Sequence, residues 1–360
     1  MKKRLFYIIL ATVFVLSDWS CVRDNEFEST PMGNFEACWQ LIDRYYCSFD
    51  VKEKEYGLDW DSIHNVYKAQ IKQSMTNREL FNVLAGMLNE LHDAHVNLIS
   101  PFQTSYYKGF YLDYEPNFSN DFLSRSTRYW ANPKCLQTGA MKYMILEPDY
   151  DIKDNVYIQD SIGYIYYGDF TNTVSDYQIY SIFDYFRDCI GIIIDVRGNG
   201  GGDDSFAYHL PSFFTDSTIT VGYMKHKTGP GHNDFSELIP TYISPAKNNL
   251  RWQKPVALIV NRGCFSAAND FAVMMKEMPK VRLIGDMTGG GGGMPISSEL
   301  PNGWSVRFSS APSFDARGEH VEGGIDPHQQ VSLTDSDKAR GVDTLIEAAR
   351  EWINGMLVNP

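Results

Sequence analysis

Apolar side chains recur at helical spacing in three segments between residues 34 and 100. Asn34 is the expected N-cap of the first helix, and the second helix is expected to follow Asp59. Thr76 and Glu79 form a capping box ahead of the third and clearest helix. These patterns predict an N-terminal module of three helices.

Beyond residue 155 the pattern changes to short apolar runs, typical of strands, that alternate with helical segments. Such alternation predicts a mixed α/β fold, with its core over 155–335. A C-terminal helix is expected within 336–360, whereas 101–154 shows no sustained period and is interpreted as an irregular connection. The expected strands are 156–158, 162–167, 191–196, 219–223, 256–260, 281–285 and 304–309, and the expected helices are 174–187, 204–214 and 336–353.

The segment from Gly191 to Gly202, GIIIDVRGNGGG, describes a buried strand that runs into consecutive glycines. Its β-branched residues suit a strand that is covered on both faces. Glycines adopt backbone conformations closed to other residues and can present bare N–H groups to a ligand. The loop is therefore a candidate cradle for an anionic oxygen.

A second buried strand, at 256–260, leads through a turn to Ser266 at the start of an apolar helix. The dipole and unpaired N–H groups of a helix N-terminus favour negative charge that develops at this hydroxyl. A nucleophile and an anion cradle together suggest acyl-transfer chemistry. Two other readings remain: Ser266 as a simple helix cap, and Cys264 as the nucleophile, although its apolar neighbours suit a packed thiol.

His95, in the stretch LHDAHVNL, is the candidate base because it lies between a helix end and a short apolar strand, where a side chain can point into a cleft. The alternative is a histidine of the core or of a helix cap. His92 and His95 resemble half of a metal site, but no third ligand has suitable spacing and HEXXH is absent. We therefore expect no metal and no cofactor.

The five glycines from Gly289 to Gly293 are followed by Met294 and Pro295, not by the Lys-Ser/Thr pair of a phosphate loop. Such a run can form a flap or an exposed backbone edge for an extended peptide, which makes Gly289, Gly290 and Gly291 candidate substrate-binding residues. A flexible loop without a role is the other interpretation.

The N-terminus has the pattern of a signal peptide over residues 1–20, with three basic residues ahead of an apolar run from Leu5 to Leu16. Cys21 stands where a bacterial lipoprotein would carry its acyl chains, and 21–33 would then be a tether to the membrane. This predicts a lipid-anchored protein of the cell envelope, at the outer membrane and facing the periplasm or the cell surface. An ordinary secreted protein with an incidental cysteine is the alternative.

The chain of 360 residues is 43% hydrophobic, enough for a substantial core. Its formal charge of −13 argues against a nucleic-acid partner. Five cysteines remain besides Cys21, and because their number is odd and their spacing fits no zinc pattern, we expect mostly buried thiols.

Several motifs occur in a fixed order: LHDAH at the end of the helical module, then IIIDVRGNGGG, NRGCFSAAND, IGDMTGGGGG and GEHVEGGIDP. Together they resemble the family of C-terminal-processing and tricorn-core serine peptidases. The resemblance implies a crotonase-like ββα core and a proteolytic serine at Ser266. It also implies that the substrates are peptides or unfolded protein segments.

Within that family, the resemblance favours the tricorn-like branch, which uses serine, histidine and glutamate. The other branch has a lysine in a T-x-G-K stretch, and the corresponding residues 288–291 contain none. The resemblance therefore implies Ser266 as nucleophile and His95 as base. Glu322 would orient the imidazole through a hydrogen bond that a neighbouring group can relay.

The same resemblance implies that the oxyanion is held by the N–H of Ala267 and that of Gly200 or Gly201. Two residues depart from the family pattern: His328 follows Pro327 where aspartate is usual, and Asn269 stands where an acidic residue often occurs. No PDZ-like pattern is found before the core. A non-catalytic ligand- or peptide-binding lipoprotein on the same fold and an esterase with the same triad are the competing functions.

Overall fold

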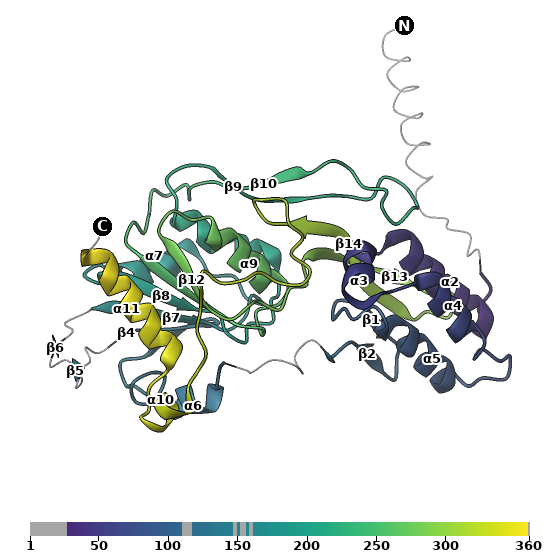
Figure 1. Cartoon of the computed structure of the whole chain (residues 1–360), viewed down its shortest axis with the longest axis horizontal. Coiled ribbons are helices and arrows are strands. Elements are labelled where there is room, and N and C mark those ends of the chain that lie inside the picture. Colours follow the sequence, from purple (N-terminus) through teal and green to yellow (C-terminus); the bar gives the residue numbers. More distant parts are fainter. Residues whose placement is uncertain (1–26, 110–116, 147–149, 152–155, 158–160, 359–360) are drawn as a thin grey trace, which may run out of the picture.

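The computed structural model describes residues 27–109, 117–146, 150–151, 156–157 and 161–358 (Figure 1). The predicted signal peptide, the predicted lipidation site Cys21 and the first part of the tether lie outside these residues. Across the described ranges, no helix is long and apolar enough to span a bilayer.

The N-terminal module contains four helices where three were predicted: α2 (Pro31–Tyr45), α3 (Phe49–Tyr56), α4 (Trp60–Lys68) and α5 (Asn77–Asn89). The additional helix is α3, whose sequence FDVKEKEY is short and highly charged and has almost no apolar period. The capping box ahead of α5 and the Asp59 cap of α4 are confirmed. The Asn34 cap is wrong, because the Thr30 hydroxyl accepts the Gly33 N–H and Pro31 occupies the first turn.

A six-stranded sheet lies against this module and contains β1 (Asn97–Ile99), β2 (Thr104–Tyr106), β9 (Ile219–Met224), β10 (Ile239–Ile243), β13 (Gly293–Glu299) and β14 (Ser305–Phe314). Strand β14 is the longest and pairs with β1, β9 and β13. Buried side chains of α2, α4 and α5 pack on those of β1 and β14, so the module and the sheet share one core. Figure 1 shows the helical module with β1, β2 and β13 at one end of the molecule, and β9 and β10 nearer to its middle.

The seven-stranded sheet at the other end has the order β15-β12-β11-β8-β7-β4-β3. Its five strands from β15 to β7 run parallel. Strand β8 is buried on both faces, as predicted: Ile192 and Ile194 face one core and Ile193 the other. The strands are β3 (Leu136–Thr138), β4 (Met141–Leu146), β7 (Ile162–Tyr167), β8 (Gly191–Asp195), β11 (Val256–Val260), β12 (Val281–Gly285) and β15 (Gln329–Gln330).

Helices cover both faces of this sheet, and the predicted mixed α/β class is confirmed. One face carries α7 (Asp176–Tyr185), α8 (Asp204–His209) and α9 (Ala267–Lys276), and the other carries α11 (Thr344–Val358). The single helix predicted at 336–353 is two, because α10 (Asp335–Ala339) ends before Gly341, which has a φ of 74°. The connection at 101–154 is more regular than expected, since it contains β2, α6 (Asn120–Arg125), β3, β4 and β5 (Tyr150–Asp151), which pairs with β6 (Val156–Tyr157).

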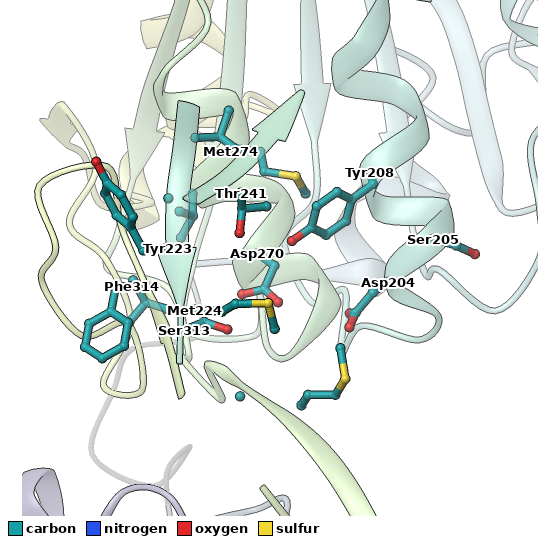
Figure 2. A pocket seen from close by; sticks show the side chains of 16 residues that line it. Asp204, Ser205, Tyr208, Tyr223, Met224, Thr241, Asp270, Met274, Ser313 and Phe314 are labelled. Carbon is teal, nitrogen blue, oxygen red and sulfur yellow. The ribbon is translucent and has the colours of Figure 1, made fainter. Parts of the chain in front are cut away.

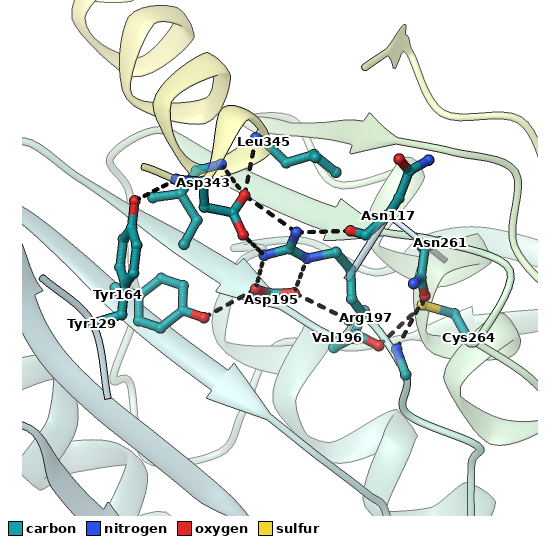
Figure 3. A network of polar contacts seen from close by, with 12 residues as sticks. Asn117, Tyr129, Tyr164, Asp195, Val196, Arg197, Asn261, Cys264, Asp343 and Leu345 are labelled. Carbon is teal, nitrogen blue, oxygen red and sulfur yellow. Dashed lines mark hydrogen bonds and ion pairs between the residues drawn. The ribbon is translucent and has the colours of Figure 1, made fainter. Parts of the chain in front are cut away.

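A cluster of fully buried charges fixes the end of β8, where the glycine loop begins (Figure 3). We call Arg197, Asp195 and Asp343 the Arg197 cluster. The guanidinium bonds both oxygens of Asp195, at 2.9 and 2.7 Å, and both oxygens of Asp343, at 3.2 and 3.0 Å. A further N–H donates to the backbone oxygen of Asn117. This cluster ties the strand that leads into the glycine loop to the N-terminus of α11.

Candidate active site

Ser266 lies in a tight turn between β11 and α9, and its backbone is strained. Its φ of 59° and ψ of −128° fall in a region that a residue with a side chain rarely adopts. The Ser266 N–H donates to the oxygen of Gly290 at 2.9 Å. A Cβ atom at Gly201 would lie 2.9 Å from the Cβ of Ser266, so only glycine fits beside it. The two predicted segments therefore meet, and strain of this kind is concentrated at functional sites.

His95 reaches Ser266 from the opposite sheet. It follows α5 and precedes β1, and its Nε2 lies 2.9 Å from the Ser266 Oγ. The side chain is buried, and burial lowers the pKa of His95 to about 4. The imidazole is therefore neutral at pH 7 and able to accept the serine proton.

The other ring nitrogen of His95 meets a residue that the sequence did not identify. Nδ1 lies 3.2 Å from the Oγ of Ser309, which is fully buried on β14. If Nε2 accepts the Ser266 proton, Nδ1 carries the ring proton and donates it to Ser309. Strand pairing explains this contact, because Asn97 of β1 is opposite Arg307 of β14 and the antiparallel register brings positions 95 and 309 together.

Glu322 does not contact His95 directly. Its Oε1 lies 3.1 Å from the Nζ of Lys52, and its buried Oε2 has no hydrogen-bond partner among the described residues. Burial, and next the charge of Asp93, raise the pKa of Glu322 to about 8. The group that contacts the imidazole at Nδ1 is thus Ser309, whereas Glu322 pairs with Lys52.

Lys52, Asp93, Glu322 and Tyr46 form a second buried cluster, which we call the Lys52 cluster. Burial alone would lower the pKa of Lys52, but the charges of Glu322 and Asp93 raise it above its ordinary value, so the amine stays protonated. Asp93 accepts the backbone N–H of His95 at 2.7 Å and the Tyr46 hydroxyl at 2.9 Å. The cluster therefore holds the backbone of His95 and places the Asp93 carboxylate near its ring.

The three predicted oxyanion donors differ in availability. The Gly201 N–H donates to the Asn199 side chain at 2.9 Å. The N–H groups of Gly200 and Ala267 have no acceptor within the described part of the chain. Gly200 is exposed and Ala267 opens α9. Of the two glycines weighed from the sequence, Gly200 is the one with a free amide.

The predicted exposed edge at Gly289 to Gly291 is wrong, because these glycines are buried. The Gly289 N–H donates to the oxygen of Cys264 at 2.7 Å, and the Gly291 N–H to the oxygen of Glu322 at 3.0 Å. A Cβ atom at Gly290 would come within 1.9 Å of the same Glu322 oxygen. The run is glycine-rich because it packs between the backbones of Ser266 and Glu322, where a side chain would clash. Its role is therefore to hold the backbone of Ser266 in place.

Cys264 is a packed thiol, as expected. It is fully buried, its Sγ donates to the Val196 oxygen at 3.0 Å, and burial raises its pKa to about 12. The two departures from the family pattern have structural partners: Asn269 accepts a hydrogen bond from Thr288 at 2.7 Å, and His328 accepts the Leu283 N–H at 3.0 Å. No group of three His, Cys, Asp or Glu side chains that could hold a metal occurs in the described ranges.

Comparisons with known proteins agree with this architecture. Residues 161–331 match the model of peptidase family S41, and residues 27–89 match that of the tricorn protease C1 domain. The crystal structure of a candidate peptidase from Parabacteroides merdae is 41% identical, with a TM-score of 0.80, over 91% of this chain and 97% of that one. Mature CPAF shares the fold with a TM-score of 0.68 at 13% identity, over 90% of this chain and 96% of that one.

The carboxy-terminal processing protease CtpA of Bacillus subtilis is 29% identical over 154 residues, which is 42% of this chain. The match spans only 31% of the length of that relative. The fold, the strained serine turn and the histidine beside it have the architecture of the serine peptidase class. The chain belongs to peptidase family S41.

Proposed function

We propose that this protein is a serine peptidase that hydrolyses peptide bonds in peptides or unfolded protein segments. The observation that carries the proposal is the 2.9 Å contact between the Ser266 Oγ and the Nε2 of a buried, neutral His95. Membership of family S41 supports the same reaction class.

In the proposed mechanism His95 removes the Ser266 proton while the Oγ attacks the substrate carbonyl carbon. The amides of Gly200 and Ala267 stabilise the resulting oxyanion. His95 then gives its proton to the leaving amine, which departs and leaves an acyl-enzyme. Water, activated by the same imidazole, hydrolyses the ester and restores Ser266.

In both acylation and deacylation, His95 becomes an imidazolium for part of the reaction. This buried positive charge needs compensation. Ser309 accepts the Nδ1–H at 3.2 Å, and Asp93 favours the charged ring electrostatically. We assign Lys52 and Glu322 the role of positioning residues: the two side chains pair with each other, and the charge of Lys52 acts on the His95 ring. A direct glutamate–imidazole bond is not part of the proposal.

We further propose that the chain acts at the cell envelope, anchored through acyl chains on Cys21. The support is the signal pattern of residues 1–20, with basic residues ahead of an apolar run and a cysteine at its end. Metabolic labelling with a fatty-acid analogue tests this, and a Cys21→Ala variant that still carries label would contradict it.

The enzymatic proposal is tested by incubating the mature protein with casein and with a simple ester. Ser266→Ala should abolish both activities and retain the fold, whereas Ser310→Ala, which changes a half-buried serine on β14, should match wild type. Hydrolysis of the ester alone would favour an esterase. A folded wild-type protein inactive on both would favour a binding protein and contradict the proposal.

A further inference from the structure

A cavity of about 310 Å³ lies along α9 (Figure 2). Residues of α8, α9, β9, β13 and β14 line it. Its walls are largely apolar and include Val221, Met224, Met274 and Phe314. The volume is at the lower end of the range for ligand pockets, which suits a single substrate side chain.

One lining residue of the cavity lies a single helical turn from the nucleophile. Asp270, on its lining, donates its N–H to the Ser266 oxygen at 3.1 Å, one helical turn into α9. Four residues of helix advance about 6 Å, which an extended long side chain can span. Two further lining residues flank the site: Val321 precedes Glu322, and Gly293 ends the glycine run behind Ser266.

Two carboxylates face this space without a cation. Figure 2 shows the carboxylates of Asp204 and Asp270 and the Tyr208 hydroxyl turned toward the same region. Neither aspartate forms an ion pair with any residue that the structure describes, and the polar neighbour of Asp270 is the Asn269 side chain. Burial, and next the charge of Asp204, raise the pKa of Asp270 to about 8, and burial likewise raises that of Asp204. The two half-buried carboxyl groups thus have no cation beside them among the described residues.

We propose that this cavity receives the side chain of the substrate residue whose carbonyl Ser266 attacks, and that Asp270 with Asp204 selects lysine or arginine there. This inference rests on the proposed peptidase function. The apolar walls contact the methylene groups of such a side chain, and its ammonium or guanidinium meets the two carboxylates. A neutral side chain of the same length forms no ion pair with either carboxyl group and therefore binds more weakly.

The test is a set of fluorogenic peptides that differ only in the residue before the scissile bond: lysine, arginine, norleucine or methionine. Wild type should cleave the lysine and arginine peptides with kcat/KM about tenfold or more above that for norleucine. Asp270→Asn should lower kcat/KM for the two cationic peptides about 10- to 100-fold and leave norleucine within about threefold. Asp216→Asn, which removes an exposed carboxylate elsewhere, should change none of these values.

Equal cleavage of lysine and norleucine peptides by wild type, or an unchanged preference in Asp270→Asn, would overturn the inference while the peptidase assignment stands. A second measurement does not depend on catalysis. Benzamidine should bind Ser266→Ala in calorimetry, more weakly after Asp270→Asn is added, and neutral benzamide should not bind. Benzamidine binding without any peptide cleavage would refute the proposed function alone, and absence of benzamidine binding would refute the pocket.

Discussion

The two buried charge clusters of this protein have one cation and two carboxylates each, yet they differ in how fully their polar atoms are bonded. Arg197 bonds both oxygens of both aspartates. In the Lys52 cluster, the Oε2 of Glu322 has no partner among the described residues, and the pKa of Glu322 is raised to about 8. Both clusters adjoin the site: Arg197 lies at the start of the glycine loop, and Asp93 of the Lys52 cluster bonds the backbone of His95.

The difference separates a structural role from a functional one. A cluster in which every carboxylate oxygen is bonded fixes the backbone around it, because any substitution leaves a buried charge unpaired. An unsaturated cluster keeps a group that can gain or lose a proton, which suits a place where an imidazolium forms and disappears. Substitutions in the Arg197 cluster should therefore act on stability, and those behind His95 mainly on rate.

The largest expected effect is that of His95→Ala. Because this removes the base while leaving the fold in place, kcat should fall about 10⁴-fold or more with little change in thermal unfolding. Steady-state kinetics and calorimetry on the same preparation check both parts. A folded variant with wild-type kcat would remove His95 from the mechanism.

Arg197→Met should have the largest effect on stability. It leaves Asp195 and Asp343 buried without their cation, and the free energy of unfolding should fall by about 3–5 kcal/mol. Denaturant unfolding measures the loss, with Arg187→Met as the control because that side chain is 69% exposed. Equal stability of the two variants would contradict a structural role for the Arg197 cluster.

Lys52→Met tests the other cluster and should cost less stability, about 1–3 kcal/mol, because Glu322, with its pKa raised to about 8, already holds a proton near pH 7 and leaves less charge unpaired when Lys52 is lost. The value of kcat should fall about tenfold to a hundredfold, because the electrostatic environment of His95 changes. Unfolding and kcat measured together give the ratio of the two effects. A stability loss as large as that of Arg197→Met with an unchanged rate would contradict a functional role for this cluster.

Glu322→Gln should produce a smaller change in rate, about tenfold or less, because the substitution keeps the shape of the side chain. The raised pKa of Glu322 stabilises the fold at low pH, and this contribution is lost as pH rises through about 8. Unfolding followed between pH 5 and pH 9 should show a flatter curve for the variant. Identical curves for both proteins would mean that Glu322 does not titrate in this range.

The smallest expected effect is on how kcat/KM falls at acid pH. Because burial lowers the pKa of His95 to about 4, kcat/KM should persist well below pH 6.5 and fall toward pH 4. The lowered pKa also means that the stability contributed by neutral His95 is lost as pH falls through about 4. A pH profile with casein or a peptide substrate measures the limb, and a midpoint near 6.5 would argue against a buried neutral base.

The serine half of the site was predictable because its signals are local. Strand, turn and helix around Ser266 follow one another in the chain. Of the strands from β7 to β12, each was predicted within a few residues except β10, which was not predicted. The glycine run at 289–293 was misread as an exposed edge, because sequence shows small side chains and not the backbone that presses on them.

The histidine half depends on contacts between distant segments. Ser309 meets His95 only through the register of β1 with β14, and Lys52 arrives on α3, a helix with almost no apolar period. Asp93 had a local signal, since it precedes His95 by two residues and accepts its N–H. An aspartate at this spacing is a common backbone anchor, and the sequence offered no way to know that it is buried.

The central claim is that Ser266 is a nucleophile activated by His95. A fluorophosphonate probe followed by intact-mass measurement and peptide mapping tests it directly. We expect one adduct per chain, on Ser266, with no adduct in Ser266→Ala and strongly slowed labelling in His95→Ala. A folded wild-type protein that takes up no probe, or Ser266 labelling at an unchanged rate in His95→Ala, would contradict it.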